Sequence, residues 1–179
     1  MDSRPVKFLI VDDHAVVREG LASVVELASP DAVVLQARDC ASALAAAAAH
    51  PDIAMVLMDL QMPDATGLSA VETFVARHPD LPVMVVSGSE APEDVRQALA
   101  LGALGYAPKS ASASTLVSAI RLVLTGEVYV PPLILQAPVA APTVSGLAGL
   151  TDRQREVLRL VCADQSNKQI AYTVGITEG

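Results

Sequence analysis

Residues 6–14 read Val-Lys-Phe-Leu-Ile-Val-Asp-Asp-His, an apolar run that stops at two acids. Similar runs recur along the chain, and the five together are Val6–Val11, Val33–Ala37, Ile53–Met58, Val83–Ser87 and the weaker Leu104–Tyr106. They are nearly continuous in Val, Ile, Leu and Met, which is typical of strands covered on both faces. The stretch at 6–14 therefore predicts the first buried strand of a sheet, with polar residues at its end.

Segments with helical spacing of apolar residues lie between these runs. Their apolar positions are Val17, Leu21 and Val24, then Ala41–Ala49, then Leu68, Val71 and Val75, then Val95 and Leu99, and finally Leu116, Ile120 and Leu124. Strand and helix alternate five times, which predicts βαβ units with right-handed crossovers. We therefore expect an α/β fold, a five-stranded parallel, doubly wound sheet that binds ligands at the carboxyl ends of its strands.

Composition and charge restrict the class of protein. The chain has 179 residues, of which 52% are hydrophobic, and a formal net charge of -8. This composition can bury one ordinary domain and a smaller second one, unlike that of a disordered chain. The four basic and four acidic residues of 149–179 cancel, so the whole net charge belongs to residues 1–148. That acidic balance disfavours a nucleic-acid partner for the first part of the chain.

Several features predict a cytoplasmic protein with no membrane partner. The N-terminus lacks the basic and apolar regions of an export signal. Cys40 and Cys162 have no metal or redox spacing, so we expect reduced thiols. The uncharged stretch 128–151 contains four prolines, and a membrane-spanning helix would lose backbone hydrogen bonds there, which favours a linker.

Acidic residues end two of the predicted strands. Asp12 and Asp13 follow the first strand and Asp59 follows the third. These ends are neighbours near the point where the strand order of such a sheet reverses, so three carboxylates should converge. Like charges at ~4 Å repel by about 4 kcal/mol per pair at an effective dielectric constant near 20. The cluster should therefore take up protons or hold a cation, and carboxylate oxygens favour Mg²⁺.

A hydroxyl and an ammonium group belong to the same set of strand ends. Ser87 ends the fourth strand and Lys109 follows the fifth. A carboxylate nucleophile, a divalent metal and donors for phosphoryl oxygens are together suited to phosphoryl transfer. For Asp12 and Asp13 alone, capping of the next helix is the simpler interpretation, but the ordered set with Asp59 favours the site. For His14 we expect a position at a helix start, because no second histidine has zinc-ligand spacing.

Four motifs in this set resemble those of the receiver domain of bacterial response regulators, over roughly residues 5–126. They are Ile10-Val-Asp-Asp-His14, Met58-Asp-Leu-Gln-Met-Pro63 with Gly67, Val85-Val-Ser87 and Gly102-Ala-Leu-Gly-Tyr-Ala-Pro-Lys-Ser110. The resemblance implies a flavodoxin-like receiver domain at residues 1–128. It also implies a protein that accepts a phosphoryl group from a sensor histidine kinase and catalyses only its own phosphorylation and dephosphorylation.

The resemblance further implies a role for each site residue. Asp59 would be the phosphoacceptor; Asp12, Asp13, Asp59 and the backbone carbonyl of Gln61 would hold Mg²⁺; Lys109 would pair with the phosphoryl group; Ser87 would hydrogen-bond it; and Tyr106 would swing inward as Ser87 moves. Two residues depart from the family pattern. Pro108 stands where an aliphatic residue is usual and removes a backbone donor beside the site. Gly88 stands where alanine is commoner and is expected to admit water to the phosphoryl group.

The remainder of the chain predicts a linker and a small helical domain. Residues 129–148 are rich in Pro and Ala, which favours a linker. Residues 149–179 contain Leu150-Thr151, Ser166-Asn167-Lys168 and Ile170-Ala171. By these motifs they resemble the beginning of a LuxR-type helix-turn-helix, as in NarL/FixJ transcription factors. The recognition helix of that domain falls after the last residue of the sequence. We therefore expect an all-α domain truncated before that helix, no DNA-binding residues in this chain, DNA binding only in a full-length form, and a possible homodimer.

The sequence has three alternative interpretations of function. An aspartyl-nucleophile phosphatase would need a second acid two residues after the nucleophile, where Gln61 stands. A nucleotide-binding Rossmann module would need a glycine-rich loop after the first strand, which is lacking. A signalling module that acts through protein contacts alone, without DNA binding, differs from a response regulator only in its output.

Overall fold

The computed structural model describes residues 5–62, 65–66 and 68–132. The chain divides into two units, Met1–Ala137 and Pro138–Gly179, and all described residues belong to the first. The predicted helix-turn-helix at 149–179 and most of the predicted linker therefore lie outside the described residues. The three predicted domain ranges stay predictions.

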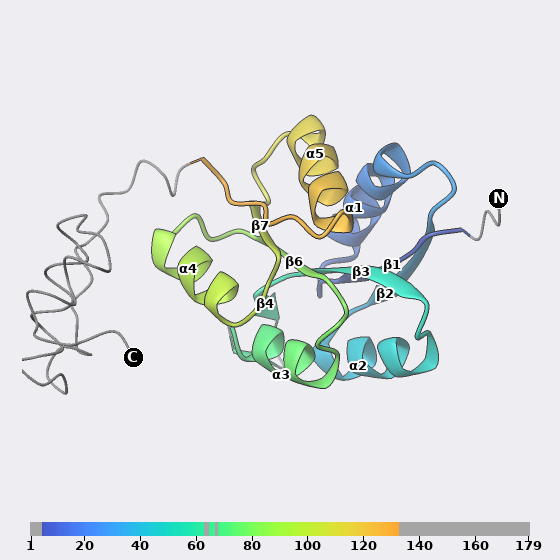
Figure 1. Cartoon of the computed structure of the whole chain (residues 1–179), viewed down its shortest axis with the longest axis horizontal. Coiled ribbons are helices and arrows are strands. Elements are labelled where there is room, and N and C mark those ends of the chain that lie inside the picture. Colours follow the sequence, from blue (N-terminus) through green and yellow to red (C-terminus); the bar gives the residue numbers. More distant parts are fainter. Residues whose placement is uncertain (1–4, 63–64, 67, 133–179) are drawn as a thin grey trace, which may run out of the picture. The chain divides into compact units, whose positions relative to one another are not determined.

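The described chain forms a parallel sheet flanked by helices, which confirms the predicted fold class (Figure 1). The sheet has five strands in the order β2-β1-β3-β6-β7. Its strands are β1 Lys7–Val11, β2 Val33–Ala37, β3 Ile53–Met58, β6 Val83–Ser87 and β7 Gly105–Pro108. The helices are α1 Ala15–Ala28, α2 Cys40–Ala49, α3 Ser69–Arg77, α4 Pro92–Ala100 and α5 Ala113–Leu124.

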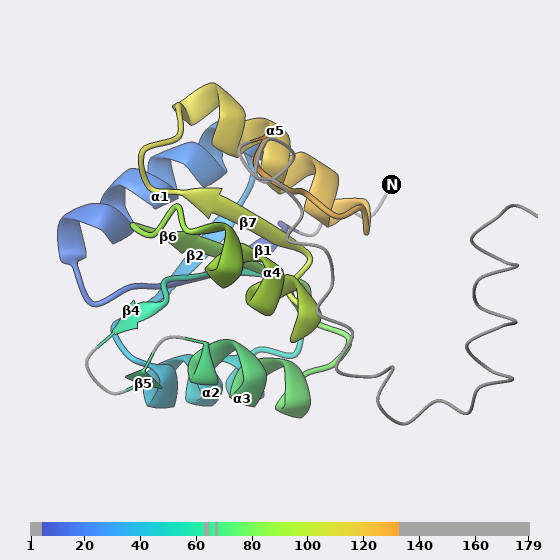
Figure 2. The same ribbon diagram turned by 90° about the vertical axis from the view of Figure 1, so that its left-hand side faces the viewer.

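The alternation of side chains along each strand produces two separate cores. In β1, Leu9 and Val11 pack with the buried residues of α2, α3 and α4, whereas Phe8 and Ile10 pack with those of α1 and α5. Successive strand residues point to opposite faces, so one apolar run serves both layers. Figure 2 shows these layers on the two sides of the sheet. Both faces are thus covered, and polar groups concentrate at the strand ends.

Three details differ from the expectation. A small antiparallel pair, β4 Gln61–Met62 with β5 Ala65–Thr66, follows β3 and was not predicted. Strand β2 lies at an edge of the sheet and is only partly buried, rather than covered on both faces. Strand β7 extends to Pro108, beyond the predicted end at Tyr106. A two-residue strand is too short to show a hydrophobic period, and an apolar run such as that of β2 predicts a strand but not whether it lies at the edge of the sheet.

The outer edge of β7 corrects the expectation for Pro108. The Tyr106 N–H donates outward to the Tyr129 carbonyl (3.1 Å), while the Lys109 N–H donates inward to the Ser87 carbonyl (2.7 Å). Backbone groups of successive residues point to opposite sides of a strand, so the nitrogen of Pro108, two residues after Tyr106, faces outward like that of Tyr106. The donor that proline lacks is therefore at the sheet edge, a tolerated position, and the strand pairing beside the site is intact.

A glycine turn between α4 and β7 gives a test of the fold. Gly102 has φ +101°, and a Cβ there would lie 2.9 Å from Val75 Cγ1. Gly102→Ala should lower the free energy of unfolding by more than about 1 kcal/mol, because it adds backbone strain and a steric clash. Gly20→Ala, in open space on α1, should raise it by roughly 0.5–1 kcal/mol. Urea denaturation measures both, and equal effects of the two substitutions would contradict the assigned turn.

Candidate functional site at the carboxyl ends of the strands

The three predicted acids lie together at the ends of β1 and β3. These strands are neighbours, and the Asp59 N–H donates to the Val11 carbonyl at 2.8 Å, which fixes the register of the two ends. One oxygen each of Asp12, Asp13 and Asp59 and one nitrogen of His14 lie within 4.8 Å of one another. Asp12 and Asp59 are 0% and 1% exposed. The parallel sheet thus brings two buried carboxylates and a partly exposed one to a single point.

Lys109 neutralises part of this charge. Its Nζ lies 2.7 Å from Asp12 Oδ2 and 2.7 Å from Asp59 Oδ2. Burial alone would lower the pKa of the Lys109 ammonium, but the hydrogen bonds and charges of the two acids outweigh it, and the pKa is raised above its ordinary 10.5. The other Asp59 oxygen, Oδ1, is buried and has no hydrogen-bond partner among the described residues.

Ser87 and Tyr106 form the adjoining part of the site. Both are fully buried, and the Ser87 hydroxyl accepts a hydrogen bond from the Ser89 N–H (3.2 Å). The Tyr106 hydroxyl donates to the Ser89 carbonyl at 2.7 Å, so this side chain lies inward. Burial raises the pKa of the Tyr106 hydroxyl, against the lowering effect of its contacts with Ser87 and Ser89. An inward swing coupled to Ser87 stays a prediction.

Gln61 and Gly88 meet at the mouth of the site. Gln61 lies in β4, two residues after Asp59, and its side chain is exposed. A Cβ at Gly88 would lie 3.3 Å from the Gln61 Oε1, so the absence of a side chain at Gly88 lets this amide approach the residue after Ser87. The ligand role of the Gln61 carbonyl and the effect of Gly88 on water stay predictions.

Two residues near the acids were not predicted as parts of the site. His14 precedes the first residue of α1, as expected, but its Nδ1 also lies 2.8 Å from Asp13 Oδ1 and 3.3 Å from Asp12 Oδ1. The Arg18 guanidinium donates to the backbone carbonyl of Asp12 at 2.7 Å. Arg18 lies four residues after His14, which is one helical turn. This spacing is the signal in the sequence that could have placed Arg18 near the acids.

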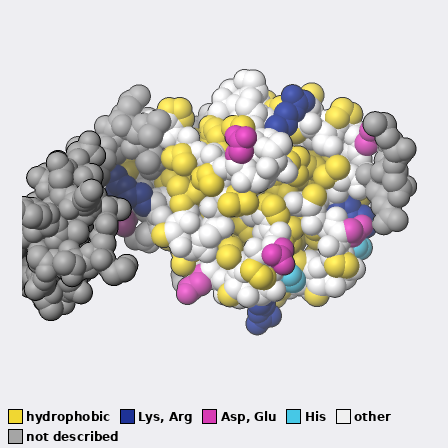
Figure 3. Space-filling view, in the orientation of Figure 1, with side chains coloured by type: hydrophobic (Ala, Val, Ile, Leu, Met, Phe, Trp, Pro, Cys, Tyr) yellow, Lys and Arg dark blue, Asp and Glu magenta, His cyan; other side chains and the backbone are white. Residues whose placement is uncertain are grey.

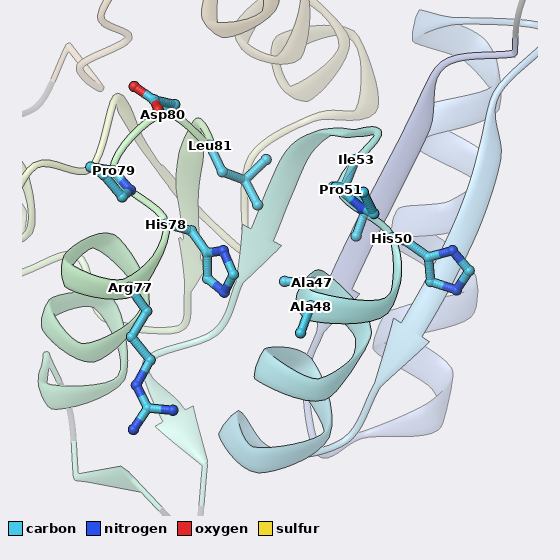
Figure 4. A pocket seen from close by; sticks show the side chains of 10 residues that line it. All are labelled: Ala47, Ala48, His50, Pro51, Ile53, Arg77, His78, Pro79, Asp80 and Leu81. Carbon is cyan, nitrogen blue, oxygen red and sulfur yellow. The ribbon is translucent and has the colours of Figure 1, made fainter.

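A separate cavity of about 380 Å³ lies at the opposite end of the strands. It is lined by residues at the ends of α2 and α3 and before β6, including His50, Arg77 and His78. In Figure 4 the His78 ring points toward the end of α2, whereas the His50 ring points away from it. The two imidazoles do not converge, so this cavity lacks the arrangement of a metal site.

The described surface shows neither a membrane span nor a basic patch on the face of Figure 3. No described helix has the length and apolar character that crossing a membrane requires. On the face in Figure 3, charged side chains lie singly among hydrophobic ones. A nucleic-acid groove would present Lys and Arg as a continuous stripe. The described side chains on this face therefore form no such stripe.

The acidic site fits a hard divalent cation. Such ions bind oxygen ligands, and Mg²⁺ in particular uses one or two carboxylates together with water and phosphate oxygens. Asp59 Oδ1 and Asp13 supply carboxylate oxygens that are not engaged by Lys109. A parallel α/β sheet with acids, a hydroxyl and a lysine at its carboxyl edge defines the receiver class of signalling domain.

Comparison with known proteins agrees with this class. A family model for the response regulator receiver domain matches residues 8–121, and one for bacterial regulatory proteins of the luxR family matches residues 148–179. The glycerol metabolism activator of Pseudomonas putida is 35% identical, over 96% of this chain and 82% of that protein. The transcriptional regulatory protein MctR of Rhizobium johnstonii is 34% identical, over 99% and 83%.

A solved structure gives the same result. The two-component response regulator of the LuxR family from Aurantimonas sp. superposes with a TM-score of 0.68 at 28% identity, over 74% of this chain and 94% of that one. The chain belongs to the response regulator family of two-component systems, with a receiver domain followed by a region of the luxR type.

The Lys109 pairs give a testable pH dependence. Because the folded pKa of Lys109 is raised, its ammonium contributes stability that is present below pH 10.5 and lost as the pH rises through the folded pKa. Lys109→Met should remove this part of the alkaline decrease in unfolding free energy, measured by urea denaturation from neutral to alkaline pH. The raised pKa of Tyr106 also makes the unfolding free energy fall as the pH rises, and this contribution is the same in the wild type and in Lys109→Met.

Lys7→Met is the matched control, since Lys7 pairs with the exposed Asp52 at the other end of the sheet. It should leave the Lys109 contribution in place. Superimposable alkaline profiles for the wild type and Lys109→Met would contradict the role assigned to these ion pairs.

Proposed function

We propose that the chain is a phosphorylation-dependent response regulator in which Asp59 accepts a phosphoryl group from a sensor histidine kinase. The observation that carries the proposal is the state of the Asp59 carboxylate. One of its oxygens pairs with Lys109, and the other is buried beside the acids of β1 without a hydrogen-bond partner among the described residues. A carboxylate held in this way presents one lone oxygen to an incoming phosphorus.

The reaction is an in-line transfer. A carboxylate oxygen of Asp59 attacks phosphorus, a P–O bond forms, and the P–N bond to the kinase imidazole breaks, with the electron pair leaving on the nitrogen. Mg²⁺, held by Asp12, Asp13, Asp59 and the Gln61 carbonyl, would neutralise charge on the phosphoryl oxygens. The Lys109 ammonium donates to one of these oxygens, and the Ser87 hydroxyl to another. The chain thereby catalyses only its own phosphorylation and dephosphorylation.

The proposed output is transcription in the cytoplasm. Ser87 and Tyr106 are buried, and Tyr106 bonds the Ser89 carbonyl in the loop that leads to α4. A new hydrogen bond from Ser87 to a phosphoryl group would reorient its hydroxyl, whose oxygen accepts from the Ser89 N–H, and would so act on this loop. The match of residues 148–179 to the luxR family supports DNA as the further partner of a full-length form. The ranges 1–128, 129–148 and 149–179 are the proposed receiver, linker and helix-turn-helix, and a homodimer stays a prediction.

Intact-protein mass tests the phosphoacceptor. The wild type, incubated with Mg²⁺ and acetyl phosphate, should gain the mass of one phosphoryl group. Asp59→Asn should gain none, because an amide oxygen is not a nucleophile for this transfer, and chelation of Mg²⁺ should abolish the gain.

Asp80→Asn is the control, since Asp80 is exposed and lines the cavity at the other end of the sheet. It should be phosphorylated like the wild type. A folded, Mg²⁺-binding wild type that gains no mass would instead favour a module that signals through protein contacts alone.

A further inference from the structure

We propose that Arg18 is a positioning residue for the cation site, which it serves by holding the turn between β1 and α1 in the shape that directs Asp12 and Asp13 toward Asp59. This inference rests on the proposed function, because it assigns Arg18 to the Mg²⁺ site of that function. Arg18 lies on the first turns of α1 and is partly buried.

The guanidinium connects three elements. Its Nη1 donates to the Asp12 carbonyl at 2.7 Å, and its Nε donates to Gln36 Oε1 on β2 at 3.1 Å. The Arg18 backbone N–H donates to the His14 carbonyl at 3.1 Å, which anchors the residue in the helix. One side chain thus ties the end of β1 to the start of α1 and to the neighbouring strand.

The bonded carbonyl controls where both acids point. It belongs to the rigid peptide plane between Asp12 and Asp13, so rotation of this plane changes the direction of both carboxylates. The Asp12 carboxylate is held separately, by the His14 N–H (2.8 Å) and by Lys109 (2.7 Å). Among the described contacts, the Arg18 bond holds this plane, whereas the Asp12 N–H, which donates to the Ala37 carbonyl (3.2 Å), belongs to the preceding plane between Val11 and Asp12.

The charge of Arg18 has the opposite effect on cation binding. Both guanidinium contacts above are to uncharged oxygens, and a positive group near the acids repels Mg²⁺. If Arg18 acted only through its charge, its removal would strengthen Mg²⁺ binding. If it positions the acids, its removal weakens binding, as loss of outer partners of metal ligands generally does. The two effects therefore predict opposite changes in Mg²⁺ affinity when Arg18 is replaced.

The experiment measures Mg²⁺ affinity by calorimetry on the whole chain. Arg18→Met should weaken binding by about tenfold, and Arg18→Lys should recover only part, because an ammonium cannot bridge both oxygens in the same plane. Arg121→Met is the matched control: Arg121 also donates to two uncharged oxygens, the backbone carbonyls of Leu27 and Ala28, but at the far end of α1. It should leave Mg²⁺ affinity unchanged.

A second readout needs no metal. In the metal-free protein, hydrogen exchange at the amides of Asp13 and His14 should become faster in Arg18→Met and stay unchanged in Arg121→Met. Gln36→Ala keeps the charge and removes one partner, so it should weaken Mg²⁺ binding by a smaller factor and serves if Arg18→Met does not fold.

The outcomes separate the two proposals. A wild type that does not bind Mg²⁺ contradicts the proposed function. The exchange rates then still test whether Arg18 holds the turn between β1 and α1. A wild type that binds, with affinity in Arg18→Met equal to or tighter than its own, overturns the inference and leaves the proposed function standing.

Discussion

The paired contact of one ammonium with two buried carboxylates is the interaction on which the site depends. Lys109 lies 2.7 Å from both Asp12 and Asp59, which come from the ends of β1 and β3. Without it, like charges would face each other in a region of low dielectric constant, where their repulsion is large. Lys109 itself follows β7 at the edge of the sheet, so this contact links three strands. The same ammonium is then available to a phosphoryl oxygen without any rearrangement of the fold.

The sheet separates stability from chemistry. Along β1 the apolar side chains alternate between two cores, and the polar residues begin where the strand ends. Helices cover each core, so the interior stabilises the fold, and the carboxyl edge of the sheet can carry mutually repelling carboxylates. The cavity near His78, at the other end of the strands, lacks converging ligands although it is large. The candidate site therefore lies where the strands end, and cavity volume does not indicate its position.

Hydrophobic patterning was sufficient for most of the fold. The bounds of β2, β3 and β6 agree with the predicted runs, because a continuous apolar strand between polar turns leaves a clear signal. The convergence of Asp12, Asp13 and Asp59 followed from topology alone. The β4–β5 pair could not be predicted, because its strands are too short to show a hydrophobic period. The contacts of Arg18 could not be predicted either, because they depend on the direction of a side chain between elements. The outward direction of the Pro108 nitrogen depends on the position of β7 at the edge of the sheet, which the sequence pattern does not show.

The closed edge of β7 has a consequence for self-association. Between Leu104 and Lys109 the backbone donors face β6, except at Tyr106, whose N–H is bonded to Tyr129, and at Pro108, which has none. An exposed strand edge normally offers a row of free N–H groups to which the strand of another molecule can add, the first step toward aggregates. Here that row is absent on this side of the sheet. Two copies that meet along β7 find carbonyl acceptors there but no free N–H donor between Leu104 and Lys109, so a regular ladder with bonds in both directions cannot extend the sheet from this strand.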